Sequence, residues 1–307
     1  MGAILGATAQ CGPMPAFSRR QLAILIVLTV VWGLNWPVMK LGVTGLAPLT
    51  FRAMCMWLAV PVMGLALAVL KAPLAVPRAH WGTLLWLGVV NMVLWHGLAI
   101  VAISTLSSGR AAILGYTMPI FSAVLGALAF GDRLAPRAWG GVAAAALGVL
   151  LLLWHELAHL GGRPLGVAFM LLAAAGWALG TQLLRRSRIP VPTLTLAFWM
   201  TVETAVAISV LALLLERGQW HAPGAVAWGA IIYNAVLALG FAQSAWFVLV
   251  RALPPVASTL SVMLIPALGV FSGALWLGER LHWQDWAAVA LMVLAIASVL
   301  WPRRGMK

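Results

Sequence analysis

The chain is dominated by long apolar runs that recur along its whole length. A helix needs about 20 apolar residues to cross a hydrocarbon core of about 30 Å, and ten runs of roughly this length are separated by short polar breaks. They cover residues 21–41, 45–70, 81–103, 107–130, 136–154, 165–185, 193–215, 225–249, 254–278 and 284–302. The pattern predicts an all-α integral membrane protein with ten transmembrane helices.

Composition supports this prediction and leaves no room for a soluble domain. Of the 307 residues, 64% are hydrophobic and only 8% are charged, too few to cover the surface of a soluble globule. The breaks between the runs are short and carry the Gly, Pro and charged residues that end helices. Residues 1–20 and 303–307 are predicted to be cytoplasmic tails.

The net charge of +13 is distributed unevenly between the two sides of the predicted bundle. Ten spans place both termini on one side. That side holds thirteen of the nineteen Lys and Arg residues, the other side holds five, and Arg52 lies inside a span. By the positive-inside rule both termini face the cytoplasm of a multi-pass protein in the bacterial inner membrane. The basic excess is therefore an orientation signal, and no nucleic-acid partner is predicted.

The two halves of the chain repeat each other. Residues 119–134 match residues 266–281 at an offset of 147, and both segments begin with Pro and end with Gly-Asp/Glu-Arg-Leu. This predicts two five-helix repeats, 21–160 and 161–302. Because five is odd, the second repeat enters the membrane upside down relative to the first. Inverted repeats of this kind are typical of transporters that work by alternating access around a site at the midplane.

The paired prolines before Gly-Asp/Glu-Arg-Leu, the Trp32-Gly-Leu-Asn-Trp stretch and the duplicated plan resemble the EamA-type family of the drug/metabolite transporter superfamily. The resemblance covers about residues 20–302, and it is strongest to the branch that exports aromatic amino acids. It implies a secondary transporter that exports amino acids or related metabolites. It also implies that helices 1, 3, 4, 6, 8 and 9 surround a central cavity, with helices 5 and 10 peripheral or at a homodimer contact.

Polar and aromatic residues at mid-depth are the candidates for substrate binding, because an unpaired polar group in hydrocarbon costs several kcal/mol. For each one, a hydrogen bond between helices is the alternative role. Lys40 could attract a carboxylate or extend to the headgroups. The predicted substrate-binding residues are Asn35, Trp36, Lys40, Asn91, Trp95, His96, Tyr116, Trp177, Gln182, Tyr233, Gln243, Ser244 and Met263.

The aromatic residues of this set favour an aromatic or hydrophobic small-molecule substrate, and membrane lipid is the other expected partner. Pro37, Pro119 and Pro266 each remove a backbone donor and are predicted gating or hinge points. Two charged residues, Arg52 and Glu203, lie within predicted spans, and an ion pair between them is a hypothesis. Arg110 is expected at the cavity mouth or among the headgroups.

One motif points to a different class of protein. His155-Glu-Leu-Ala-His159 matches the H-E-x-x-H pattern of zinc peptidases, so a membrane metallopeptidase using His155, Glu156 and His159 is an alternative function. The pair falls at the predicted outer surface, Glu203 is buried in another predicted helix, and no downstream span offers the acid-bearing turn that such a peptidase needs. The prediction is therefore a transporter without enzymatic activity, cofactor or metal site. Efflux of lipophilic drugs is the second alternative, although helix 1 lacks the carboxylate that cationic drugs usually require.

Overall fold

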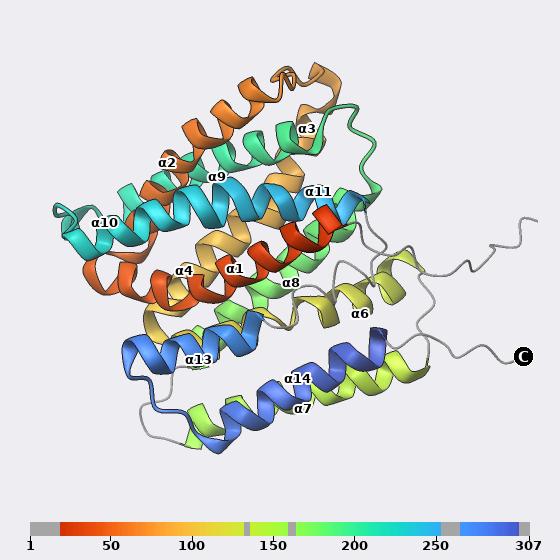
Figure 1. Cartoon of the computed structure of the whole chain (residues 1–307), viewed down its shortest axis with the longest axis vertical. Coiled ribbons are helices and arrows are strands. Elements are labelled where there is room, and N and C mark those ends of the chain that lie inside the picture. Colours follow the sequence, from red (N-terminus) through yellow and green to blue (C-terminus); the bar gives the residue numbers. More distant parts are fainter. Residues whose placement is uncertain (1–18, 132–135, 159–163, 253–264, 301–307) are drawn as a thin grey trace, which may run out of the picture.

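The computed structural model describes residues 19–131, 136–158, 164–252 and 265–300, and all regular structure within these ranges is helical (Figure 1). The first half contains α1 (Arg19–Gly45), α2 (Pro48–Val69), η1 (Arg78–His80), α3 (Trp81–Leu87), η2 (Gly88–Val93), α4 (Leu94–Thr105), α5 (Ser108–Gly115), α6 (Met118–Phe130) and α7 (Pro136–Ala158). The second half contains α8 (Pro164–Arg186), α9 (Thr193–Leu215), η3 (Arg217–Gln219), α10 (Ala225–Ile232), η4 (Tyr233–Gln243), α11 (Ser244–Ala252), α13 (Ile265–Leu277) and α14 (Trp283–Leu300).

The length and composition of these helices fit a membrane protein. Within the described ranges, 7 continuous helical segments are long and apolar enough to cross a bilayer. Three further apolar segments, 139–148, 265–277 and 283–295, are shorter. Many outward-facing side chains, such as Leu65, Val69, Leu214 and Leu275, are apolar and well exposed, as contact with lipid requires. The predicted all-α membrane fold is confirmed at this level.

The helices form an inner bundle with one pair at its edge. The inner helix α1 contacts α13, η4 and α10, while α4 packs against α8 and α2 packs against α9. The helices α7 and α14 lie side by side along the lower edge in Figure 1 and make most of their contacts with each other. These two helices correspond to predicted helices 5 and 10. Their peripheral position agrees with what the family resemblance implies.

The fourth predicted span is broken, where the sequence predicts one continuous helix over 107–130. The helix α5 ends at Gly115 and α6 begins at Met118, so Tyr116 and Thr117 lie at the break. Pro119 explains the position, because it has no N–H to donate to the carbonyl of Gly115, four residues earlier, and its ring would clash with that carbonyl in a continuous helix. At the break the Leu114 carbonyl accepts from both the hydroxyl of Thr117 at 2.7 Å and its backbone N–H at 3.1 Å.

Two further departures from regular helix occur in the third and eighth spans. Residues Gly88–Val93 and Tyr233–Gln243 adopt the wider π-helical turn. Such segments are rare in proteins overall, and those that occur are often at functional sites. The hydrophobic pattern gives no signal for them, and the spans 81–103 and 225–249 are predicted as plain α-helices. Both stretches lie in spans that the family resemblance assigns to the central cavity.

Local structure repeats at the sequence offset of 147 residues. The helices α6 and α13 are each 13 residues long, and each begins one residue before a proline, Pro119 in one and Pro266 in the other. Each ends at a glycine in the left-handed region, with φ of 71° at Gly131 and 63° at Gly278. Glycine adopts this conformation without the penalty that a Cβ imposes and commonly ends helices. The repeated sequence thus folds into the same local structure twice.

Two buried or partly buried carboxylates bind helix N-termini at one end of the bundle, on the left of Figure 1. Glu216, after α9, accepts from the backbone N–H groups of Leu49 at 2.9 Å and Thr50 at 2.7 Å, and from the Thr50 hydroxyl at 2.8 Å. Glu279, after α13, accepts in the same pattern from Ser108 N–H at 2.7 Å, its hydroxyl at 2.9 Å and Gly109 N–H at 3.2 Å. A helix N-terminus has unpaired N–H groups and a partial positive charge, so both contacts stabilise the bundle.

We expect Glu216→Gln to lower the free energy of unfolding by about 1–3 kcal/mol, because the amide loses the charge and one acceptor for the α2 N-terminus. The measurement is the thermal unfolding midpoint of the purified protein in detergent. Arg217→Gln is the matched control, because it removes an exposed charge at the adjacent position. Equal midpoints for Glu216→Gln and Arg217→Gln would contradict the role given to the carboxylate.

Candidate functional site: a central aromatic cavity

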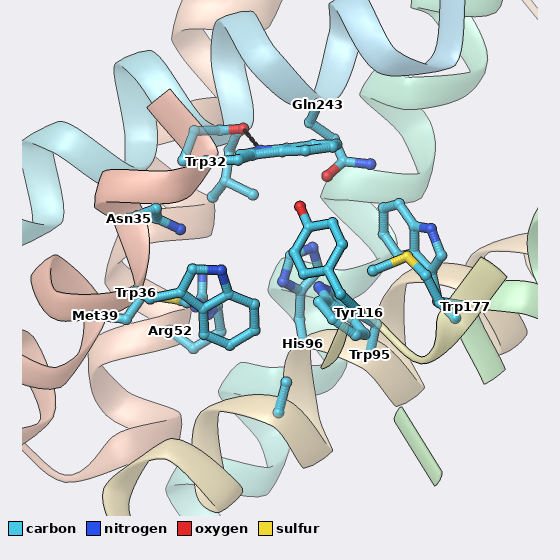
Figure 2. A pocket seen from close by; sticks show the side chains of 14 residues that line it. Trp32, Asn35, Trp36, Met39, Arg52, Trp95, His96, Tyr116, Trp177 and Gln243 are labelled. Atoms are coloured by element: carbon cyan, nitrogen blue, oxygen red, sulfur yellow. Dashed lines mark hydrogen bonds between the residues drawn. The ribbon is translucent and has the colours of Figure 1, made fainter. Parts of the chain in front are cut away.

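A cavity of about 60 Å³ lies among α1, α2, α4, η4 and α8, at the break between α5 and α6. Its lining side chains point toward one another in Figure 2. We call it the central cavity, and it is lined by Trp32, Asn35, Trp36, Met39, Arg52, Trp95, His96, Ala99, Tyr116, Met118, Trp177, Ala238, Leu239 and Gln243. A water molecule needs about 10–15 Å³ of such space, so this conformation has room for a few waters and not for an amino acid.

Aromatic rings form a continuous wall around the central cavity. The ring centroids of Trp36 and Trp95 lie 6.5 Å apart, and those of Trp36 and Tyr116 lie 6.3 Å apart. Trp95 is in turn 5.3 Å from Trp177. These separations and tilted orientations are the ones that aromatic pairs favour. A flat apolar solute that enters between the rings can make the same contacts.

Close packing against glycine fixes the position of Trp36. A Cβ on Gly115 would lie 2.8 Å from Trp36 Cη2, and one on Gly269 would lie 3.1 Å from Trp36 Cδ1. Only glycine allows α5 and α13 to approach the indole so closely. The Trp36 side chain is 3% exposed. It packs α1 against α5 and α13, and it also forms part of the cavity wall.

Hydrogen bonds to backbone carbonyls hold α1 against η4. The indole N–H of Trp32 donates to the Ala238 carbonyl at 3.2 Å, the interaction drawn in Figure 2. The hydroxyl of Tyr233 donates to the Val31 carbonyl at 2.8 Å. Tyr233 is a predicted binding residue, and the structure places its hydroxyl in this contact between helices and not on the cavity.

Four buried polar atoms on the cavity lining have no hydrogen-bond partner among the described residues. They are Asn35 Oδ1, Arg52 Nε, His96 Nε2 and Gln243 Nε2. Each of these residues is at least nine-tenths buried. Buried polar atoms are almost always hydrogen-bonded in native proteins, so the gathering of four such atoms on one cavity marks a place where a ligand can supply partners.

Arg52 is the one charged residue on the lining of the central cavity as the structure describes it, and it comes from α2, which the family resemblance places outside the cavity. Its Nη1 donates to Asn234 Oδ1 at 3.3 Å, and its Nη2 lies 2.7 Å from the Met39 sulfur. The hypothesis of an Arg52–Glu203 ion pair is therefore wrong. The long side chain turns toward α1 and η4, away from the Glu203 position on α9.

Glu203 packs instead against the π-helical stretch of the third span. A Cβ on Gly88 would collide with the Glu203 carboxylate, so the glycine makes this close approach sterically allowed. The Oε2 atom of Glu203 has no hydrogen-bond partner among the described residues. It does not line the central cavity.

The sequence-predicted residues divide into two groups. The structure brings Asn35, Trp36, Trp95, His96, Tyr116, Trp177 and Gln243 together on the central cavity. Asn91, Gln182, Tyr233 and Ser244 lie elsewhere in the bundle. Met263 lies outside the described residues.

Two residues of the second group bind neighbouring helices. Asn91 donates to the Trp177 carbonyl at 3.1 Å, which joins η2 to α8. Gln182 donates to the Ser122 carbonyl at 2.8 Å, which joins α8 to α6. Both are the interhelical contacts that the sequence leaves open as the alternative role.

Lys40 does not line the cavity. Its ammonium donates to the carbonyls of Ile103, Ser104 and Leu106 at 2.9, 3.2 and 2.7 Å. These carbonyls belong to the end of α4, where the last C=O groups of a helix lack backbone donors. The contact with a helix C-terminus is also favoured by the helix dipole. In this conformation the charge of Lys40 is used to hold α1 to α4.

Two of the predicted hinge prolines directly follow lining residues of the central cavity, Pro37 after Trp36 and Pro119 after Met118. Pro37 is inside α1 next to Trp36, and Pro119 and Pro266 lie at the starts of α6 and α13. Pro119 also lines a second cavity of about 30 Å³, which shares Met118 and Trp177 with the central cavity and extends toward Arg185.

The remaining candidates lie at the ends of helices. Arg110 pairs with Asp285 of α14, with Nε 3.4 Å from Oδ1, and it does not line the central cavity. His155 and Glu156 fall in the last turns of α7, and His159 lies outside the described residues. Among the residues that the structure describes, no three His, Cys, Asp or Glu side chains are grouped as metal ligands.

The described ranges form a helical membrane bundle with a cavity among its helices, an arrangement that fits a membrane transporter. The model of the EamA-like transporter family matches residues 20–154 and 164–301, so the chain belongs to this family. Its members are transporters and not enzymes, which removes the zinc-peptidase alternative.

Comparisons with other proteins agree with the family. The chain is 22% identical to "Uncharacterized transporter YoaV" of Bacillus subtilis over 84% of this chain and 88% of the relative. It is 25% identical to "Uncharacterized inner membrane transporter YedA" of Escherichia coli over 90% and 89% of the two chains. It is also 25% identical to a "Probable amino-acid metabolite efflux pump" of Escherichia coli over 91% and 94%. One crystal structure shares the fold with a TM-score of 0.68 at 19% identity, over 92% and 96% of the two chains.

Proposed function

We propose that the protein exports aromatic or hydrophobic amino acids, or closely related metabolites, across the bacterial inner membrane by alternating access. The observation that carries this proposal is the central cavity, where a wall of Trp and Tyr rings surrounds four polar atoms that lack partners. Ligand sites generally combine a mostly apolar lining with a few polar groups that fix orientation. The names of the amino-acid metabolite efflux pumps of Escherichia coli and Salmonella typhimurium point to the same substrate class.

The proposed substrate-binding residues are those of the predicted set that line the cavity. In this proposal Trp36, Trp95, Tyr116 and Trp177 contact the side chain of the substrate, while Asn35, His96 and Gln243 bind its polar groups. Trp32, Met39 and Arg52 join the set from the structure.

The architecture proposed for transport is ten membrane-crossing helices in two inverted five-helix repeats, with both termini in the cytoplasm. The identical lengths and ends of α6 and α13 at the repeat offset support it. Because the cavity is too small for an amino acid in this conformation, substrate entry requires the rings to separate. The break at Tyr116 and Thr117 and the prolines Pro37, Pro119 and Pro266 are the proposed hinges, since each interrupts backbone hydrogen bonding.

Two further features follow from the same proposal. The peripheral pair α7 and α14 is the surface on which a homodimer would form, and lipid covers the exposed apolar faces elsewhere. Efflux of lipophilic cations is disfavoured, because the charged residue on the described cavity lining is the cation Arg52.

We expect the purified protein in proteoliposomes to exchange radiolabelled L-tryptophan or L-phenylalanine across the bilayer, and to exchange L-aspartate or L-lysine far more slowly. The aromatic wall favours a flat apolar side chain and offers no groups that match a second charge. Protein-free liposomes and liposomes with heat-inactivated protein are the controls, and an imposed proton gradient tests coupling. Absence of exchange with every amino acid would refute the proposed substrate class.

The inverted topology predicts that the equivalent residues Arg133 and Arg280 lie on opposite sides of the membrane. In a background without Cys11 and Cys55, Arg280→Cys should react in intact cells with a membrane-impermeant maleimide. Arg133→Cys and the C-terminal control Lys307→Cys should react only after the membrane is permeabilised. Labelling of both repeat positions from one side would contradict the inverted arrangement.

A further inference from the structure

Arg52 is more deeply buried than Lys40, Arg110 and Arg186, the other basic residues of the bundle whose contacts are described. Lys40 has three carbonyl partners, Arg110 pairs with a carboxylate, and Arg186 donates to Gln182 and lies over the Phe130 ring. Arg52 is 3% exposed, and its printed partners are a neutral amide oxygen and a thioether sulfur. Thioether sulfur is a weak acceptor, and neither partner carries a negative charge.

A buried guanidinium without a carboxylate partner is energetically unfavourable. Charged groups within a membrane pair with one another, bind carbonyls or line a substrate pathway. Among the described residues no carboxylate contacts Arg52, and its Nε–H has no hydrogen-bond partner there. Its position on the cavity lining fits the remaining role, which is to line a substrate pathway.

The surroundings of Arg52 define the chemistry of a ligand that would complete the site. The described lining of the central cavity contains no Asp or Glu, so its electrostatic potential favours an anionic group and disfavours a cationic one. Trp36 lines the same cavity as Arg52, and its ring centroid lies 6.3 Å from that of Tyr116. A solute whose carboxylate reaches Arg52 therefore places an attached ring among Trp36, Tyr116 and Trp95.

We propose that Arg52 is the carboxylate anchor of the central cavity, and that the transporter takes aromatic carboxylates, with the α-amino group of an amino acid dispensable. This inference rests on the proposed transport function and narrows its substrate class. The guanidinium suits the role because its planar donors match a carboxylate. The free Nε–H supplies one of these donors without breaking the contact with Asn234.

The first test uses the unmodified protein in proteoliposomes. Exchange of radiolabelled L-tryptophan is measured in the presence of unlabelled indole-3-propionate, which lacks the amine, or tryptamine, which lacks the carboxylate. Indole-3-propionate should compete about as well as L-tryptophan itself, and tryptamine should not compete at similar concentration. Competition by tryptamine, or a lack of competition by indole-3-propionate, would overturn the proposal. In either case, exchange of tryptophan itself would still support the proposed transport function.

The second test uses substitutions at Arg52. Arg52→Gln should raise the KM for L-tryptophan by about 100-fold, as loss of one partner of a buried charge pair does. Arg52→Lys should show a smaller increase, on the order of tenfold, because it keeps the charge and loses the planar donors. Arg217→Gln, an exposed site at the bundle end, is the control and should leave KM unchanged.

Thermal midpoints in detergent separate binding from folding in these variants. A structural role for Arg52 predicts a large fall in midpoint with an unchanged KM in the remaining folded protein, and that result would overturn the anchor. If Arg52→Gln does not fold, Arg52→Lys and the competition experiment with the unmodified protein still decide between the two roles.

Discussion

A helix bundle in hydrocarbon must find hydrogen-bond partners for its polar atoms within itself, because the lipid offers none. Three charged residues of this bundle obey that constraint by binding the ends of neighbouring helices. Glu216 and Glu279 bind helix N-termini, and Lys40 binds a helix C-terminus. These contacts use charge where the helix dipole favours it, and they hold together helices that are distant in sequence.

The constraint is not met at several buried atoms, and four of them gather on the central cavity. Four unpartnered atoms from four different elements face the same small space, while the rings around them are packed at ordinary aromatic distances. A protein that only needed a stable bundle would gain by replacing such atoms with apolar ones. In the proposed function their convergence is explained by a solute that supplies the missing partners, and the rings of Trp36 and Tyr116 favour an aromatic one.

The same packing explains how the site is linked to the ends of the bundle. Tyr116 lies at the break between α5 and α6, and the N-terminus of α5 is bound by Glu279 after α13. Trp36 lies between Gly115 and Gly269, one residue on each of these helices. Movement of α5 relative to α13 would therefore change the cavity wall and the Glu279 contact together, as the proposed alternating access requires.

Hydrophobic periodicity predicts the helical membrane fold, and the internal repeat predicts the matching ends of α6 and α13, because both depend on local residue preferences. The cavity residues on α1, α4 and α8 are predicted because polar or aromatic side chains at mid-depth are expensive in lipid. The π-helical stretches are not predicted. They differ from α-helix only in that each backbone N–H donates to the carbonyl five residues earlier in place of four, and this change leaves no signal in the composition. Lys40 and Arg52 are placed differently because their partners, three carbonyls and a sulfur atom, are visible only in the folded chain.

The most direct measurement of the central claim is an experimental structure of the protein with 5-bromo-L-tryptophan, whose bromine locates the ring by anomalous scattering. The account predicts the ring among Trp36, Trp95 and Tyr116, in a cavity widened from the present about 60 Å³, with the carboxylate within hydrogen-bonding distance of Arg52. A ligand found instead in the groove of about 550 Å³ lined by Trp57, Trp220 and Trp228, with the central cavity unchanged, would contradict it.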